Sequence, residues 1–215
     1  GGWVDVAVRI DPAYSQGEAS CEKAIGVAGR SHAGHAYLIE SLHGKWSDDE
    51  FDGIVAGVAQ RWPNAPIRVQ PVPGDTVWAS HFNRLLIARG QAARVTSVVG
   101  KESDKVARAR AFSTVVAAGQ VHARPEFMTG QESFGQQART ATALSLSSRS
   151  VLCDTLDAGM GAIMDVLNPN DMTAAWNVND RAHAPGKPRS GDNPWATDAR
   201  FSDEGPGEDF SRGYD

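Results

Sequence analysis

Apolar and polar residues alternate along the first stretch of the chain. Residues 3–10 read WVDVAVRI, with apolar side chains at every second position from Val4 to Ile10. This alternation predicts a β-strand with one buried face. The strand is expected to end at Asp11-Pro12, because proline cannot continue a central strand.

Strand and helix patterns then follow one another as far as residue 167. Ser47 and Glu50 form a capping box in front of a periodic apolar stretch, which predicts a helix over 48–61. The other expected elements are strands at 24–28, 36–42, 66–72, 93–99 and 120–123, and helices at 76–88, 104–118 and 150–167. Three antiparallel strands followed by alternating helices and strands predict an α/β fold, in which helices flank a mixed sheet on both faces.

The composition changes near residue 168. Residues 169–215 are rich in Pro, Gly, Asn and Asp, which predicts a flexible polar tail that is disordered or used for docking. Residues 1–168 are then the folded domain. From residue 171 onward the chain has nine acidic and five basic residues, so the tail carries most of the net charge of −5. The folded part is almost neutral, and bases gathered between residues 89 and 124 could meet phosphates.

No apolar run is long enough for a membrane span, so we expect no membrane partner.

Three acidic residues are candidates for chemistry. Asp11 follows a buried strand, where a carboxylate is costly unless a partner such as a divalent metal compensates it. Asp154 and Asp157 are three residues apart at the start of a helix, so their carboxylates share one helical face. A turn at Asp-Pro and the helix dipole are alternative explanations. Together the three acids fit the arrangement that two-metal phosphodiester chemistry needs. Weaker candidates are Glu22, His81 and His122.

Three segments, in the same order, resemble the C-terminal nuclease domain of large terminase subunits from tailed bacteriophages. They are residues 8–29, with Asp-Pro-Ala and then Glu22 before AIGVAG; residues 100–122, GKESDKVARARAFSTVVAAGQVH; and residues 153–158, CDTLDA. The resemblance extends over residues 3–167. It implies an RNase H-like fold, two Mg²⁺ or Mn²⁺ ions, and an endonuclease that cuts concatemeric viral DNA during genome packaging.

By position, the resemblance implies that Asp11 and Asp154 are catalytic metal ligands, with Asp157 as a supporting or alternative ligand. The chain departs from the family at Gln70, where an acid is expected at the end of the fourth strand. Asp75 could supply the missing catalytic and metal-binding carboxylate, although it could equally cap the next helix. Otherwise the site is weakened, or Gln70 is an introduced inactivating change.

Lys105, Arg108 and Arg110 are candidate contacts to the phosphates of double-stranded DNA, because one helix presents them together. The resemblance implies further partners: the small terminase subunit, the procapsid portal, and an ATPase domain of the same full-length protein. It also implies action in the host cytoplasm. No GxxxxGK[ST] loop occurs in this sequence, so the ATPase would lie outside it. Two alternatives stay open: another RNase H-like nuclease of the resolvase or transposase type, and a catalytically weak RNase H-like module that binds DNA or docks to the portal.

Overall fold

The structure, a computed structural model, describes residues 2–12, 22–70, 75–98, 105–130, 133–141 and 154–167, with the backbone alone at residues 75 and 105–107. The expected tail over residues 169–215 lies outside the described residues. Its boundary and its role therefore stay predictions.

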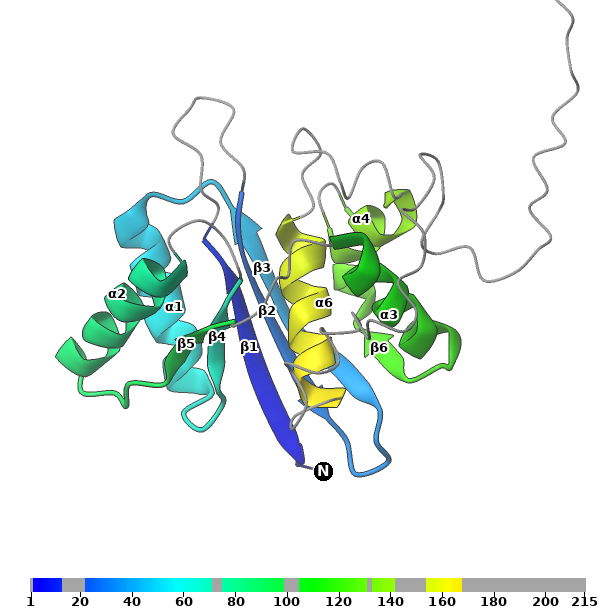
Figure 1. Ribbon diagram of the computed structural model, residues 1–215, viewed down its shortest axis with the longest axis horizontal. Coiled ribbons are helices and arrows are strands. Elements are labelled where there is room, and N and C mark those ends of the chain that lie inside the picture. The colour runs from blue at the N-terminus through cyan, green and yellow to red at the C-terminus, as the bar shows by residue number, and fades with distance from the viewer. Residues whose placement is uncertain are drawn as a thin grey trace, which may run out of the picture.

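A six-stranded sheet forms the centre of the molecule, in the order β5-β4-β1-β2-β3-β6 (Figure 1). The strands are β1 (Asp5–Asp11), β2 (Lys23–Arg30), β3 (Ala36–Gly44), β4 (Ile67–Val69), β5 (Val95–Ser97) and β6 (Val121–Ala123). Strands β1, β2 and β3 are antiparallel neighbours, whereas β4 pairs parallel with β1, β5 with β4, and β6 with β3. The predicted antiparallel start and mixed sheet are confirmed.

Helices cover both faces of this sheet (Figure 1). The helices are α1 (Asp48–Arg61), α2 (Asp75–Ala88), α3 (Lys105–Ala117), α4 (Phe134–Thr140) and α6 (Asp154–Leu167), with a 3-10 turn at Pro125–Phe127. One apolar cluster lies between the sheet and the α1–α2 layer, and the other lies between the sheet and the layer of α3, α4 and α6. None of the helices in these ranges is long and apolar enough to cross a bilayer.

Local chemistry accounts for where the elements begin and end. Glu50 N–H donates to Ser47 Oγ at 3.3 Å, and Ser47 N–H donates back to Glu50 Oε2 at 2.9 Å, so the predicted capping box of α1 is confirmed. Helix α3 is followed by Gly119, which adopts a positive φ of 70° that favours glycine. Of the strand expected over 66–72, the structure has β4 at Ile67–Val69, and residues 71 and 72 lie outside the described residues.

Helix α6 lies unusually close to the strands beneath it. A β carbon built on Gly26 of β2 would lie 2.5 Å from the carbonyl oxygen of Ala158 in α6. A β carbon on Gly161 would lie 2.9 Å from Cγ of Arg9 in β1. Real β carbons do not approach other atoms so closely, so the absence of a side chain at these positions lets α6 approach the sheet.

A buried ion pair holds the far end of the same helix. Arg9 Nη2 donates to Asp165 Oδ1 at 2.6 Å, and Arg68 Nη1 lies 3.3 Å from that oxygen. Burial raises the pKa of the Asp165 carboxyl, and the guanidinium groups of Arg9 and Arg68 oppose that rise. Removing one partner would leave a buried charge, which typically costs about 3–5 kcal/mol. The pair therefore fixes the position of α6 along β1.

We expect Gly26→Ala to destabilise the domain by about 1–3 kcal/mol, the usual cost of overpacking a close contact. The added methyl group would meet the backbone of Ala158, which can move only if α6 moves. Urea unfolding followed by circular dichroism measures the change.

Gly53→Ala is the matched control. A β carbon at Gly53, inside α1, has nothing within 4 Å, so this substitution should instead stabilise the helix by about 0.5–1 kcal/mol. Equal effects of the two substitutions would contradict the close approach of α6 to β2.

Candidate functional site

Asp11 lies at the carboxyl end of β1, on the face that α6 covers. Ile10 belongs to the apolar cluster under α1 and α2, whereas Arg9 reaches Asp165 of α6. Because successive side chains of a strand point to opposite faces, Asp11 shares the face of Arg9. Asp11 is only 5% exposed. The sequence-based expectation that a carboxylate follows a buried first strand is therefore confirmed.

Gln70 stands directly beside Asp11, at the end of β4. Its N–H donates to the carbonyl oxygen of Ile10 at 2.8 Å, which continues the parallel pairing of β4 with β1. Its side-chain Nε2 donates to the main-chain oxygen of Asp157 in α6, also at 2.8 Å. This bond fixes the orientation of the amide, and Oε1 is buried with no hydrogen-bond partner among the described residues. Gln70 therefore occupies the place where the resemblance implies an acid.

Asp157 is held from a third element. Arg108 of α3 places Nη2 at 3.2 Å from Asp157 Oδ1, and both residues are buried, at 6% and 2% exposure. The Arg108 guanidinium is thus directed at a carboxylate of α6 and not at solvent. The contact of Arg108 with DNA phosphates stays a prediction, as does metal binding by Asp157.

Asp154 lies in the first turn of α6, near the same end of the sheet as Asp11. Ala158 follows Asp154 by four residues in α6 and packs on Gly26 of β2. Ala24 precedes Gly26 by two residues in β2 and pairs with Asp11 of β1. Four helical residues advance about 6 Å and two strand residues about 6.8 Å, so the helix and the strand cover nearly the same length. The contact between the Asp157 main-chain oxygen and Gln70 shows that α6 begins at the end where β1 and β4 finish. Asp154 therefore lies at the level of Asp11.

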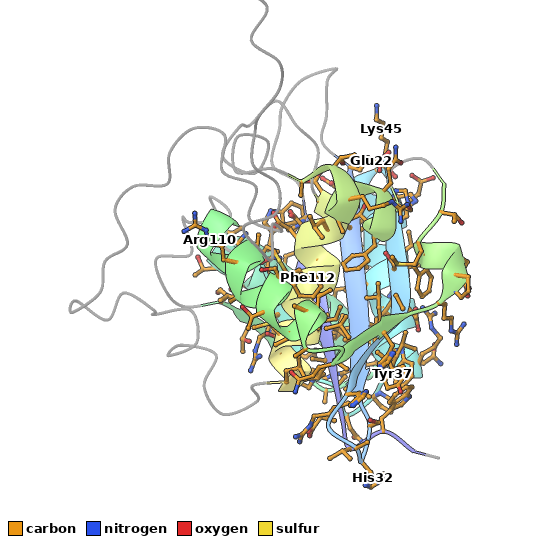
Figure 2. The ribbon with its side chains drawn as sticks, turned by 90° about the vertical axis from the view of Figure 1, so that its right-hand side faces the viewer. Glu22, His32, Tyr37, Lys45, Arg110 and Phe112 are labelled. Carbon is orange, nitrogen blue, oxygen red and sulfur yellow. The ribbon has the colours of Figure 1, made fainter. Side chains whose placement is uncertain are left out.

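The other expected site residues are only partly described. Helix α2 begins at Asp75 and α3 at Lys105, but the side chains of both lie outside the described residues. Arg110 is half-buried and lies near the start of α3, as Figure 2 shows. The roles of these three residues stay predictions.

Sequence reasoning missed the residue that caps α6. Gln137 of α4 is buried, and its Oε1 accepts a hydrogen bond from the N–H of Leu156 at 2.8 Å. The first amides of a helix have no partner inside the helix, so this side chain satisfies one of them. The two residues are 19 positions apart, and no local capping pattern joins them.

The donor atoms at this end of the sheet suit a hard cation. Carboxylate and amide oxygens are the ligands that Mg²⁺ and Mn²⁺ prefer, and Asp11, Asp154 and Gln70 supply both kinds. The buried Oε1 of Gln70, which lacks a hydrogen-bond partner within the described ranges, is an additional observation in favour of a ligand. Those ranges contain no group of three or more His, Cys, Asp or Glu side chains that could hold a metal ion. Among the described residues, the amide oxygen of Gln70 would be the third protein donor beside Asp11 and Asp154.

The weaker histidine candidates lie elsewhere. His81 belongs to α2 on the opposite face, where its Nε2 lies 2.8 Å from Asp52 Oδ1. His122 in β6 stacks on Tyr37 near the start of β3, far along the strand from the end that is level with Asp11. Neither residue comes together with Asp11.

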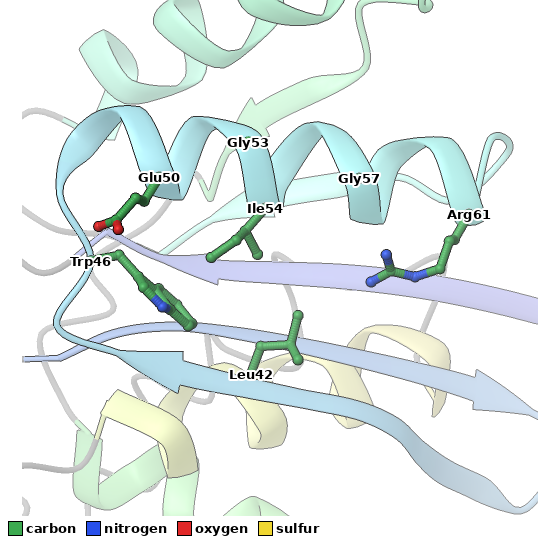
Figure 3. Close-up of a pocket in the computed structure, with 7 residues that line it drawn as sticks. All are labelled: Leu42, Trp46, Glu50, Gly53, Ile54, Gly57 and Arg61. Atoms are coloured by element: carbon green, nitrogen blue, oxygen red, sulfur yellow. The ribbon is translucent and has the colours of Figure 1, made fainter.

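An apolar groove of about 570 Å³ lies between α1 and β3, on the face away from Asp11 (Figure 3). Leu42, Trp46 and Ile54 line it, and Arg61 lies at one end. No titratable candidate of the sequence analysis points into it, so the groove is separate from the candidate site.

Two solved structures are similar to this chain, to different degrees. The human cytomegalovirus terminase nuclease domain is 17% identical with a TM-score of 0.51, over 80% of this chain and 86% of that chain. T. thermophilus RuvC in complex with a Holliday junction substrate is 16% identical with a TM-score of 0.43, over 76% and 94%. No family model and no curated protein sequence matches the chain. The predicted fold is confirmed: the chain has an RNase H-like mixed sheet flanked by helices.

We expect Gln70→Glu to destabilise the metal-free protein by about 1–3 kcal/mol and to increase its stabilisation by Mn²⁺. The new carboxylate would lose the hydrogen bond to the Asp157 main-chain oxygen and would place a buried negative charge against that oxygen. A charged ligand would bind Mn²⁺ more tightly, and saturation at 100 times the dissociation constant adds about 2.7 kcal/mol. Urea unfolding in EDTA and in Mn²⁺ measures both effects.

Gln91→Glu is the matched control for this experiment. Gln91 also donates Nε2 to a main-chain oxygen, that of Ala56, and its Oε1 is likewise buried without a hydrogen-bond partner in the described ranges. It lies in the α1–α2 layer, so its variant should lose stability without a gain from Mn²⁺. Equal stabilisation of parent, Gln70→Glu and Gln91→Glu by Mn²⁺ would show that Gln70 is not at a metal site.

Proposed function

We propose that this domain is a divalent-metal-dependent DNA endonuclease of the terminase kind, which cuts concatemeric viral DNA during genome packaging. The observation that carries the proposal is the convergence of Asp11, Gln70 and the first turn of α6 at one end of an RNase H-like sheet. The similarity to the human cytomegalovirus terminase nuclease domain supports it, as does the order of the three terminase-like segments.

Asp11, Gln70 and Asp154 would hold Mg²⁺ or Mn²⁺, with Asp75 as a further ligand from the start of α2. The proposal includes two ions, and Asp11 would be a ligand. When bound, such ions stabilise the charge on the phosphoryl oxygens and activate water. The chain's own contribution is to fix the donors: the Gln70 amide bonds to α6, and Arg108 holds Asp157 behind them.

Double-stranded DNA is the proposed substrate. Lys105 and Arg110, on the helix that packs beside α6, would contact its phosphates and orient the strand, without reading its sequence. We further propose the small terminase subunit, the procapsid portal and an ATPase domain of the full-length protein as partners, in the host cytoplasm.

Gln70 also favours a second candidate function, a catalytically weak RNase H-like module that binds DNA or docks to the portal. A neutral amide neutralises less of the charge of a divalent ion than a carboxylate would. If Asp75 does not complete the ligand set, the domain would bind DNA through its basic helix and cut it slowly or not at all.

The direct test is cleavage of supercoiled plasmid in Mn²⁺ by the parent chain and by Asp11→Asn. We expect the parent to nick or linearise the plasmid, and the variant to act more than about 100-fold more slowly. Loss of an outer-shell partner alone typically costs 10- to 100-fold, and Asp11 is proposed as a ligand itself. EDTA should abolish cleavage by the parent.

Asp52→Asn serves as the control, because Asp52 is a partly buried carboxylate on α1 that pairs with His81 on the other face. It should cut as the parent does. Equal cleavage by the parent and Asp11→Asn, or no cleavage by either, would reject the nuclease proposal. DNA binding without any cleavage would leave the second candidate function.

A further inference from the structure

A second polar pair lies at the same end of the sheet as Asp11, and the sequence resemblance assigns it no role. His43, near the end of β3, places Nδ1 at 2.8 Å from Oε2 of Glu22, which lies just before β2. The two side chains are 29% and 19% exposed, so the pair is neither fully solvated nor closed off. Figure 2 shows Glu22 at the end of the sheet opposite to Tyr37 and His32.

A β-bulge turns His43 toward α6. Val27 pairs with Glu40 and Ala28 with Leu38, so β3 carries one extra residue, Ile39, against β2. A bulge of this kind changes which face the later side chains of the strand occupy. Beyond it, Leu42 packs with the α1–α2 cluster, so its neighbour His43 points to the opposite face. Without the extra residue, His43 would lie on the face away from the candidate site.

The register then places His43 in line with Asp11. Asp11 pairs with Ala24, and Ala24 pairs with His43, so the three residues form one row on the α6 face. Two strand spacings separate the Cα atoms of Asp11 and His43 by about 10 Å. Ala24 between them ends at its β carbon, so no long side chain of β2 stands in the row. A reaction centre held by Asp11 therefore lies within reach of the imidazole, directly or through one water.

The partner of Nδ1 determines what the other ring nitrogen can do. An ionised carboxylate can only accept, so Nδ1 carries the hydrogen that it donates to Glu22. In this tautomer Nε2 is the acceptor of the ring, and the described residues provide no hydrogen-bond partner for it. A histidine oriented in this way by a carboxylate is a suitable general base, and the carboxylate stabilises the imidazolium that forms.

We propose that His43 accepts the proton of the attacking water in the phosphodiester cleavage proposed above, and that Glu22 is the positioning residue that orients it. The water oxygen forms a bond to phosphorus, the bond from phosphorus to the leaving oxygen breaks, and one water proton passes to Nε2. The leaving oxygen takes a proton from solvent, and the imidazolium returns its proton to solvent before the next turnover. This inference rests on the proposed nuclease function.

Other charged groups belong to the elements that meet at this end of the layer. They are Glu22 just before β2, Asp11 on β1, Asp154 and Asp157 on α6, Arg108 and Arg110 on α3, and Lys45 just after β3. Arg108 is paired with Asp157, and Glu22 is the group in direct contact with the imidazole.

The test is single-turnover plasmid cleavage in Mn²⁺ across a range of pH. We expect His43→Ala to lower the rate about 100-fold or more, the usual contribution of a general base. The fall in rate on the acidic side of the parent's profile, where His43 takes up a proton, should disappear in this variant. Added imidazole should restore part of the lost rate, which a merely structural role would not allow.

Two further variants distinguish a loss of proton transfer from a loss of folded protein. His43→Gln can still donate an amide hydrogen to Glu22 but cannot accept a proton, so it should be as slow as His43→Ala with unchanged urea unfolding. Glu22→Gln should shift the acidic limb to lower pH, because the lost carboxylate charge no longer favours the imidazolium. His81→Ala is the matched control, since His81 has an equivalent contact with Asp52 in the α1–α2 layer. It should cut as the parent does.

The outcomes separate this inference from the proposed function. Mn²⁺ stabilisation of the protein should be lost in Asp11→Asn and kept in His43→Ala. Suppose that the parent cuts DNA, that Asp11→Asn does not, and that His43→Gln cuts as fast as the parent. Then the proposed role of His43 is wrong and the nuclease proposal stands. A slow His43→Ala that keeps the parent's acidic limb and does not respond to imidazole also overturns the inference. If the parent does not cut at all, the proposed function fails and the inference fails with it.

Discussion

Backbone-to-backbone packing between helix α6 and strand β2 sets the geometry of everything at the candidate site. Gly26 leaves no β carbon between β2 and the carbonyl oxygen of Ala158, and the buried ion pair of Arg9 with Asp165 fixes the helix along β1. Because these two contacts fix the position of α6, its first turn lies at the end of the sheet where β1 and β4 finish. Asp154 and Asp157 reach that end through this packing.

The row that results crosses four neighbouring strands and draws on residues far apart in the sequence. Gln70 just after β4, Asp11 on β1, Ala24 on β2 and His43 on β3 lie side by side on the face of the sheet where α6 packs. Side chains from helices then fix the helical end of the site, with Arg108 on the Asp157 carboxylate and Gln137 on the Leu156 amide. Buried polar groups that are held from several elements are restricted in orientation, and a metal site or a proton-transfer site requires that restriction.

Much of this fold could be predicted from local patterns. The alternation before Asp11, the Ser47–Glu50 capping box and the glycine after α3 each act within a few residues, so the sequence shows them directly. The resemblance placed Gln70 at the end of the fourth strand, but its position beside Asp11 depends on the pairing of β4 with β1, which the sequence did not predict. The contacts that tie Gln70 to α6 and Gln137 to Leu156 depend on packing between distant elements. The face of the sheet on which the His43 side chain lies depends on a single extra residue in β3. Composition and periodicity do not reveal this bulge.

The central claim is that oxygen atoms of Asp11 and Gln70 bind a divalent metal together. Anomalous diffraction from crystals of the chain soaked in Mn²⁺ tests this most directly, because it locates the metal without relying on activity. The account predicts a manganese peak within coordination distance, about 2.0–2.6 Å, of an Asp11 carboxylate oxygen and of Gln70 Oε1. Manganese that binds only elsewhere, with Asp11 and Gln70 uncoordinated at saturating concentration, would contradict it.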